Sequence, residues 1–361
     1  MREIQYKTFS LNTHKKNWQL KRPNVCQFEL TFRCGLRCNY CYSDCYNRPA
    51  YLKKELKTDE VKHILDKVYD AGVIWLCFTG GDPLTRKDFL DIYSYAKEKG
   101  FIITIFSNLT SLTKRIVEHL KKNPPFVIEI TLNAATRNLY EKITGVEDSF
   151  DKVMRGIESV KKAKLPMKIK TQITKDNLAE IPKIRSFVKG LGLKFSPSTD
   201  LYARLNGDSA PCNLRLSPQE ILSLNGKGRI SDDACELLRD TKHRTPNTKA
   251  RTPNTSLFRC TIGGGDGFNV DPYGRTFPCA LIRKPAFNLL KVNIEYALNE
   301  LLSLVRERRF TVDSKCSGCG LRESCRWCPG RAYVERGDME TPVEYYCELA
   351  NKTAQRGRML S

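Results

Sequence analysis

Short apolar runs alternate with amphipathic stretches through the first two hundred residues. Six runs have the length and the β-branched and aromatic content of buried strands. They are Val25–Thr31, Val73–Thr79, Phe101–Phe106, Phe126–Leu132, Met167–Thr174 and the weaker Leu193–Pro197. Strand starts recur about every 25 to 50 residues, a spacing typical of parallel βα units with right-handed crossovers.

Helical stretches fill the intervals between these runs. Val61, Ile64, Leu65 and Val68 fall on one stripe, with Thr58 predicted as the N-cap and Gly72 as the end of the helix. A second helix is predicted from about Thr85 to Lys99, where Gly100 stops it.

Six strands are fewer than the eight of a closed barrel. We therefore expect an α/β fold in the form of an open, partial (β/α)6 TIM-like barrel, with a doubly wound sheet as the alternative. In both, reactive groups belong at the carboxyl ends of the strands.

Four segments are expected along the chain. Residues 1–24 precede the barrel, 25–205 form it, 206–258 are an irregular linker or lid, and 259–361 form a small C-terminal domain. The linker contains the near-duplicate RTPNT at 244–248 and 251–255, which is too short and polar to bury a face.

The amino-acid composition limits the class of protein and the cellular compartment that we expect. The chain has 361 residues, of which 40% are hydrophobic, enough for a buried core. It has no apolar run long enough to span a bilayer and no signal-peptide pattern at its start, and its 15 cysteines are an odd number. We expect a cytoplasmic protein in which cysteines bind metal rather than form disulfides.

The first cysteine group is Cys34-Gly-Leu-Arg-Cys38-Asn-Tyr-Cys41, directly after the first strand. Three thiolates can hold three irons of a cubane cluster and leave the fourth iron without a protein ligand. A zinc site is the alternative, although the spacing is not the usual paired CxxC.

This CxxxCxYC loop resembles the signature of the radical S-adenosylmethionine (SAM) superfamily. The resemblance implies that SAM chelates the open iron through its amino and carboxylate groups, and that one electron cleaves it to a 5′-deoxyadenosyl radical.

Residues at successive strand ends extend the resemblance. Gly80, Gly81 and Asp82 resemble the family's GGEP loop, which binds the SAM amino group, with Asp in place of the usual Glu. By the same resemblance, Ser107 and Asn108 are expected near the ribose, and Tyr40 along the adenine. Thr131 is expected near the SAM carboxylate and Arg155 paired with it, while Asn133 stands where relatives often have an acid.

A second cysteine group lies near the C-terminus. Its spacing is poor for a zinc ribbon and resembles the SPASM extension of radical SAM enzymes, whose seven cysteines hold two auxiliary cubane clusters. The resemblance implies a nearer cluster on Cys260, Cys279 and Cys328, with one iron open. It implies an outer cluster on Cys316, Cys319, Cys325 and Cys347. Three [4Fe-4S] clusters and SAM are thus the expected cofactors.

Five cysteines remain unassigned: Cys26, Cys45, Cys77, Cys212 and Cys235. A hydrogen-donor role is conceivable for Cys212 or Cys235. The general base is unknown, and Asp266 and Asp271 are weak candidates beside ordinary turn roles.

The resemblance implies an oxidoreductase that modifies a peptide, through a thioether or carbon–carbon crosslink in a ribosomally made peptide. The alternatives are oxidation of a tetrapyrrole or other small molecule, maturation of a protein of the sulfatase type, and a non-enzymatic electron carrier. Lys and Arg number 61 against 40 Asp and Glu, a net charge of +21 that suits an acidic peptide. Expected partners are a flavodoxin or ferredoxin donor and a separate peptide-recognition protein. Nucleic acid and membrane are not expected.

Overall fold

The computed structural model describes residues 4–20, 22–226, 256–259, 267–311, 314–322 and 324–360. Cys235, Cys260, Asp266 and the RTPNT pair lie outside the described residues.

A parallel sheet occupies the first two hundred residues. Its strands are β1 (Val25–Thr31), β2 (Trp75–Gly80), β3 (Ile102–Ser107), β4 (Val127–Thr131), β5 (Met167–Gln172) and β6 (Phe195–Ser198). Each strand pairs in parallel with the next one along the chain. This sequential order means that the chain winds in one direction, as in a barrel, whereas a doubly wound sheet reverses its order. The expected partial barrel is confirmed.

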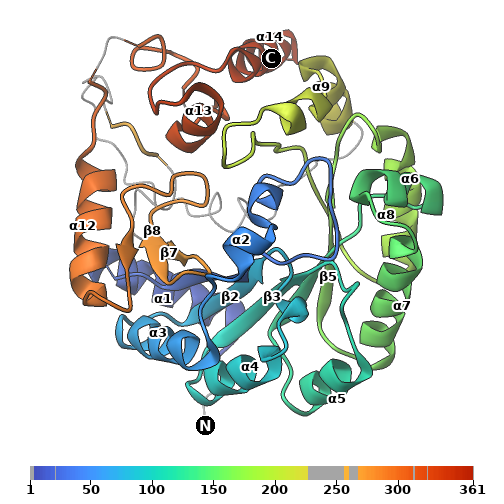
Figure 1. Cartoon of the computed structure of the whole chain (residues 1–361). Helices are drawn as coiled ribbons and strands as arrows, with labels where there is room; N and C mark the ends of the chain where they lie inside the picture. The colour runs from blue at the N-terminus through green and yellow to red at the C-terminus, as the bar shows by residue number, and fades with distance from the viewer. Residues whose placement is uncertain are drawn as a thin grey trace.

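Helices cover the outside of the strands (Figure 1). They are α3 (Thr58–Asp70), α4 (Phe89–Glu98), α5 (Lys114–Lys122), α6 (Arg137–Thr144), α7 (Ser149–Lys162) and α8 (Ile181–Gly190). In β3, Ile103 and Ile105 are fully buried, whereas Thr104 and Phe106 on the other face are only partly covered. One face of the sheet therefore builds the apolar core under the helices, and the other lines the barrel interior.

The expected helices form with shifted starts. α3 begins at Thr58 with Lys57 as N-cap, because the Thr58 hydroxyl donates to Asp88 Oδ2 at 2.7 Å. The helix expected from Thr85 begins only at Phe89, because Pro83–Thr85 form a separate 3-10 turn.

The C-terminal residues continue the same sheet. β7 (Gly267–Val270) pairs in parallel with β1, followed by the antiparallel β8 (Arg275–Phe277) and β9 (Phe287–Asn288), in the order β6-β5-β4-β3-β2-β1-β7-β8-β9. The extension then forms α12 (Ile294–Glu307), α13 (Pro329–Arg336) and α14 (Glu344–Leu360). Figure 1 shows α13 and α14 across the molecule from α4 and α5. The expected boundary at residue 259 thus precedes strands that extend the barrel.

Three helices lie outside this plan. α1 (Tyr6–Leu20) precedes the barrel, and its Tyr6 hydroxyl accepts from Trp75 Nε1 at 2.9 Å. α2 (Pro49–Leu52) follows the first cysteine loop. α9 (Pro218–Gly226) lies in the segment expected to be irregular, where α14 packs against it. None of the described helices is both long and apolar enough to cross a membrane.

Candidate functional site

The first cysteine loop leaves the carboxyl end of β1 and is fixed by backbone hydrogen bonds. Arg37 N donates to Thr144 O at 2.8 Å, and Asn39 N donates to Ile143 O at 3.0 Å, which ties the loop to the end of α6. On the other side, Asn47 Nδ2 donates to Cys34 O at 2.9 Å. The loop is therefore positioned before any ligand binds.

The structure brings Cys34, Cys38 and Cys41 together. Burial raises the pKa of Cys34 to about 12, and the charge of Cys41 adds to that shift. Burial also raises the pKa of Cys38 well above its usual range, with further contributions from Cys41 and Cys34. Iron must displace these protons when it binds, as thiolate ligation requires.

Hydrogen-bond donors surround these thiols. Leu36 N and Asn108 Nδ2 both donate to Cys34 Sγ at 3.4 Å. The Tyr40 hydroxyl hydrogen-bonds to Cys38, and Ser43 Oγ lies 3.6 Å from Cys41 Sγ. Such donors stabilise negative charge on sulfur. Among the described residues, no three His, Cys, Asp or Glu side chains converge tightly enough for a single metal ion. The donor set instead fits a cubane cluster, which is wider and is held by thiolates.

The Gly80-Gly81-Asp82 turn follows β2 and touches the start of the cysteine loop. Gly81 N donates to Thr31 O at 2.7 Å, and Asp82 N donates to Arg33 O at 2.9 Å. A Cβ on Gly81 would lie 2.4 Å from Arg33 O, so this position has no room for a side chain. The glycines allow a backbone approach that no other residue permits here.

Asp82 is fully buried, and its carboxylate forms hydrogen bonds with other groups of the protein. Its carboxylate accepts from Leu84 N at 2.9 Å, from Asn108 N at 2.9 Å and from the Ser107 hydroxyl at 2.9 Å. Burial raises its pKa to about 6 despite these donors. Asp82 therefore orients the carboxyl end of β3 through these hydrogen bonds.

The remaining expected SAM contacts occupy β4 and α7. Thr131 ends β4, and Asn133 Nδ2 just beyond it hydrogen-bonds to the Tyr40 hydroxyl. Arg155 is exposed on α7. Its neighbour Gly156 is so close to Leu109 that a Cβ would lie 2.7 Å from that side chain. This turn of α7 thus lies beside the loop that carries Asn108.

The outer four cysteines also converge. The pKa of Cys316 is raised first by burial and then by the charges of Cys347, Cys325 and Cys319, to about 11. Cys319 is exposed, whereas Cys316 packs with Trp327 and Tyr346 in a buried apolar cluster. One thiol of this group therefore faces solvent and another faces the core.

Of the three cysteines expected to hold the nearer cluster, the structure describes Cys279 and Cys328. Cys328 is the N-cap of α13, and Gly330 in its first turn lies against Cys279, where a Cβ would be 3.4 Å from Cys279 Sγ. Cys279 and the start of α13 are thus adjacent. The described cysteines are all free thiols.

Among the cysteines that were assigned to no cluster, Cys26 is buried in β1 and Cys77 lies in β2. Cys45 follows the first loop, and Cys212 lies in a 3-10 turn. Asp271 is fully buried and accepts from Tyr273 N and Arg275 N, both at 3.0 Å. Its contacts are those of a turn residue between β7 and β8.

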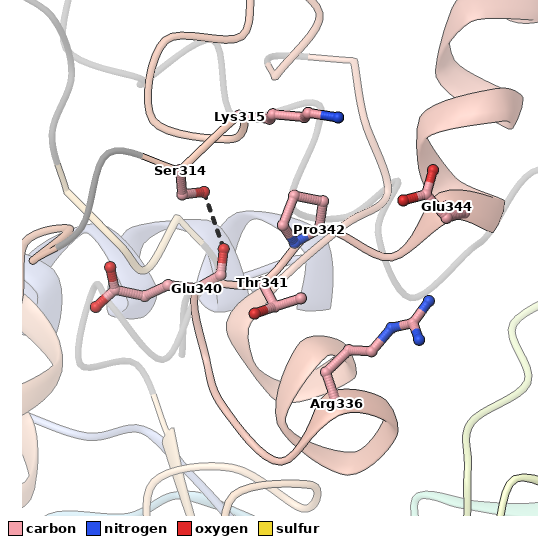
Figure 2. Close-up of a pocket in the computed structure, with 7 residues that line it drawn as sticks. All are labelled: Ser314, Lys315, Arg336, Glu340, Thr341, Pro342 and Glu344. Carbon is pink, nitrogen blue, oxygen red and sulfur yellow. Dashed lines mark hydrogen bonds between the residues drawn. The ribbon is translucent and has the colours of Figure 1, made fainter.

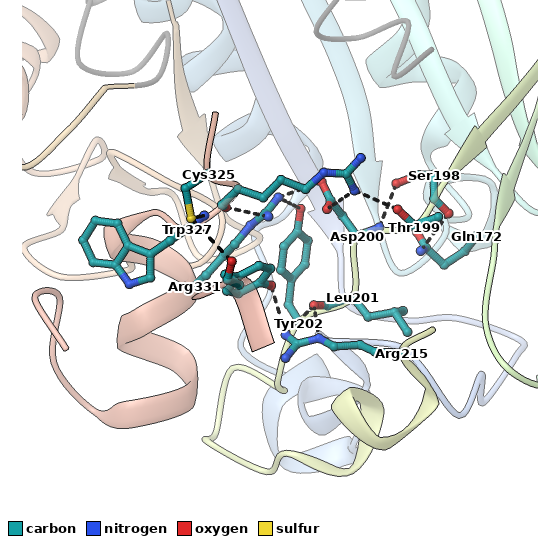
Figure 3. Close-up of polar contacts among 12 residues, drawn as sticks. Gln172, Ser198, Thr199, Asp200, Leu201, Tyr202, Arg215, Cys325, Trp327 and Arg331 are labelled. Atoms are coloured by element: carbon teal, nitrogen blue, oxygen red, sulfur yellow. Dashed lines mark hydrogen bonds and ion pairs between the residues drawn. The ribbon is translucent and has the colours of Figure 1, made fainter. Parts of the chain in front are cut away.

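A polar network joins the β6 end to the C-terminal extension (Figure 3). Arg331 Nη2 lies 2.6 Å from Asp200 Oδ2, and Arg326 Nη1 donates to Thr199 Oγ1 at 2.8 Å. Arg215 pairs with Glu335 at 2.6 Å. These contacts hold α13 against the mouth of the barrel.

An open pocket of about 530 Å³ is lined by Lys315, Arg336 and Glu344 among others. Figure 2 shows these lining residues. The pocket belongs wholly to the extension, beside the outer thiols, because Glu344 and Lys315 both influence the pKa of Cys347, which burial raises. It is separate from the strand-end site.

Three site residues escaped the sequence analysis. Glu29 in β1 pairs with Arg283, and Arg204 contacts the first cysteine loop. An acid inside an apolar strand needs a partner and was a usable signal for Glu29. No local signal marks the contact of Arg204 with the cysteine loop, because its partners there lie more than 160 residues away in the sequence.

Residues 28–188 match the sequence profile of the Radical SAM superfamily. An AdoMet-dependent heme synthase of Methanosarcina barkeri is 28% identical over 343 residues, which are 90% of this chain and 96% of that protein. A PqqA peptide cyclase of Bradyrhizobium diazoefficiens is 24% identical over 263 residues, 71% of this chain and 66% of that one.

Among solved structures, Streptococcus suis SuiB bound to precursor peptide SuiA has a TM-score of 0.68 at 17% identity. The match covers 94% of this chain and 80% of SuiB, so it includes the C-terminal extension as well as the barrel.

Proposed function

We propose that this chain, residues 28–188 of which match the Radical SAM superfamily, is an oxidative peptide-modifying enzyme of that superfamily that uses SAM and an iron–sulfur cluster held by Cys34, Cys38 and Cys41. The observation that carries the proposal is the convergence of three partly buried thiols beside the Gly80–Asp82 turn. A cluster held by Cys34, Cys38 and Cys41 would supply the electron for the reductive cleavage of SAM, and the 5′-deoxyadenosyl fragment released would take a hydrogen atom from the substrate.

The residues of the chain have distinct tasks in this proposal. Asn108, Tyr40 and the Leu36 amide donate toward the thiolates, which lowers the cost of their charge. The Gly81 backbone packs directly against Phe32 and Arg33 at the start of the cysteine loop, and Asp82 holds Asn108 in place through its amide N–H.

A crosslink between two peptide positions removes two hydrogen atoms. One ends on 5′-deoxyadenosine. The other would leave as a proton, and its electron would need an acceptor, which an auxiliary cluster held by the outer cysteines would supply. The convergence of Cys316, Cys319, Cys325 and Cys347 supports such an acceptor.

A peptide is favoured because the whole-chain fold is similar to that of a protein solved with its precursor peptide. The test is anaerobic reconstitution with SAM and dithionite, followed by co-expression with short acidic reading frames that adjoin the gene. We expect 5′-deoxyadenosine release and a peptide lighter by two hydrogen atoms. Release of 5′-deoxyadenosine without any change in peptide mass would leave the radical SAM assignment standing and count against the peptide.

A tetrapyrrole carboxylate is the second candidate, since the relative aligned over 90% of this chain is named a heme synthase. Titration with a propionate-bearing iron porphyrin distinguishes the two. Saturable absorbance changes, with consumption of the porphyrin in the presence of SAM, would favour the tetrapyrrole.

A further inference from the structure

A compact turn after β6 rests on the first cysteine loop. In this 204–208 turn, Arg204 N donates to Asp208 O at 2.8 Å and Gly207 N donates to Arg204 O at 2.8 Å. Gly207 has a φ of +90°, which favours glycine. Asp208 Oδ1 accepts from Ala210 N at 2.9 Å, so the turn is braced on both sides.

The turn makes three contacts with the loop that carries the first thiols. Leu205 N donates to Tyr42 O at 2.9 Å. The Arg204 guanidinium donates from Nε to Cys41 O and from Nη2 to Asn39 O, both at 3.4 Å. A single cation thus spans the backbone between the second and third cysteines of the motif.

The charge of Arg204 is only partly balanced. Its partner Asp208 lies 2.8 Å from Nη1, but the Asp208 side chain is 42% exposed against 23% for Arg204. Solvent therefore screens the carboxylate more than the guanidinium. At Cys45, four residues beyond the motif, the charge of Arg204 opposes the rise that burial causes in the pKa of that thiol.

Other charged groups near these thiols are more fully compensated. Asp44 influences Cys38 and Cys41, and it pairs with Arg37 at 3.1 Å and with Arg48 at 3.7 Å. Asp82 influences Cys34 and accepts the three hydrogen bonds described above. Arg204 is thus the cation that contacts the loop backbone directly at two of its carbonyls.

We propose that Arg204 is a positioning residue that makes the cluster on Cys34, Cys38 and Cys41 easier to reduce. Reduction adds a negative charge to the cluster, and a guanidinium on the ligand loop stabilises that charge. The inference rests on the proposed function, because it requires a cluster at these three thiols.

The test is the midpoint potential of the electron paramagnetic resonance signal that changes when SAM is added to the anaerobic, reconstituted full chain. This signal belongs to the SAM-binding cluster and separates it from the others. Arg204→Gln removes the charge, and we expect its cluster to be about tenfold harder to reduce, which is about 59 mV for a one-electron couple. Arg204→Lys keeps the charge and should restore most of the shift.

Asp208→Asn is the matched control. It breaks the same ion pair but removes a negative charge, so the potential should move in the opposite direction, toward positive values. If the midpoint potential shifts in the same direction in Arg204→Gln and in Asp208→Asn, the cause is the broken ion pair, which loosens the turn, and not the charge of Arg204. That result would overturn the proposal. Should Arg204→Gln retain no cluster, the sign of the Asp208→Asn shift decides.

The experiment separates a failure of the proposed function from a failure of the role assigned to Arg204. No SAM-sensitive signal in the unaltered protein would overturn the proposed function and this inference with it. A SAM-sensitive signal whose potential is the same in Arg204→Gln would overturn the role of Arg204 alone.

Discussion

Arg283 forms a two-pronged ion pair with Glu29, with Nη1–Oε2 and Nη2–Oε1 distances of 2.7 Å each. Glu29 lies in β1 and is 2% exposed, whereas Arg283 comes from the segment between β8 and β9. The pair therefore fastens the extension to the first barrel strand, in an environment where an isolated charge is costly.

Glu29→Gln should lower the free energy of unfolding by about 3–5 kcal/mol, because it leaves the Arg283 guanidinium buried without its counter-charge. Anaerobic urea denaturation measures the loss. Glu158→Gln is the control, since that carboxylate pairs with Lys162 on the surface, with both side chains more than half exposed. It should change stability by less than about 0.5 kcal/mol. Equal effects of the two substitutions would contradict the structural role assigned to the buried pair.

Cys38→Ala should abolish release of 5′-deoxyadenosine, because one of three ligands of the SAM-binding cluster is lost. Chromatography of the reaction mixture after reduction with dithionite measures this. Cys45→Ala is the control from the same segment, as Cys45 hydrogen-bonds to the Tyr42 carbonyl at 3.9 Å and belongs to no proposed ligand set. The ligand assignment is wrong if Cys45→Ala loses the activity and Cys38→Ala keeps it.

Gly81→Ala should weaken SAM binding and destabilise the fold by about 1–3 kcal/mol, since the added Cβ meets Arg33 O at 2.4 Å and Phe32 O at 2.6 Å. Equilibrium dialysis with SAM and thermal unfolding measure the two effects. Gly190→Ala makes the same chemical change at the end of α8, with no atom within 4 Å of the new Cβ. We expect it to be neutral or slightly stabilising. Unimpaired SAM binding in Gly81→Ala would exclude the close backbone approach.

Cys319→Ala should reduce iron content by up to one cluster while SAM cleavage continues, because the outer thiols are separate from the first loop. Product formation should fail if the outer cluster accepts the second electron. Iron analysis and 5′-deoxyadenosine release are read together, with Cys212→Ala as a control that retains full iron. Loss of SAM cleavage in Cys319→Ala at normal stability would show that the two sites are not independent.

The barrel was predictable because its strands are continuous apolar runs, such as Trp75–Phe78, between helical stripes. The proximity of Cys34, Cys38 and Cys41 was predictable because they are close in sequence. Contacts between distant segments were not. Nothing local in Arg204 or Arg283 indicates a partner more than 160 residues away. The start of α4 was misplaced because Arg86 pairs with Asp88 at 2.7 Å, which organises a turn where a helix was expected.

The pairing of β7 with β1 has a mechanical consequence. Val25 to Phe28 align with Gly267 to Val270 in unbroken register, so the two cysteine-bearing parts share one hydrogen-bonded scaffold rather than a hinge. Redox groups carried by the two parts would keep a constant separation through a catalytic cycle. Electrons could then cross between them by tunnelling, without any swinging of one part toward the other.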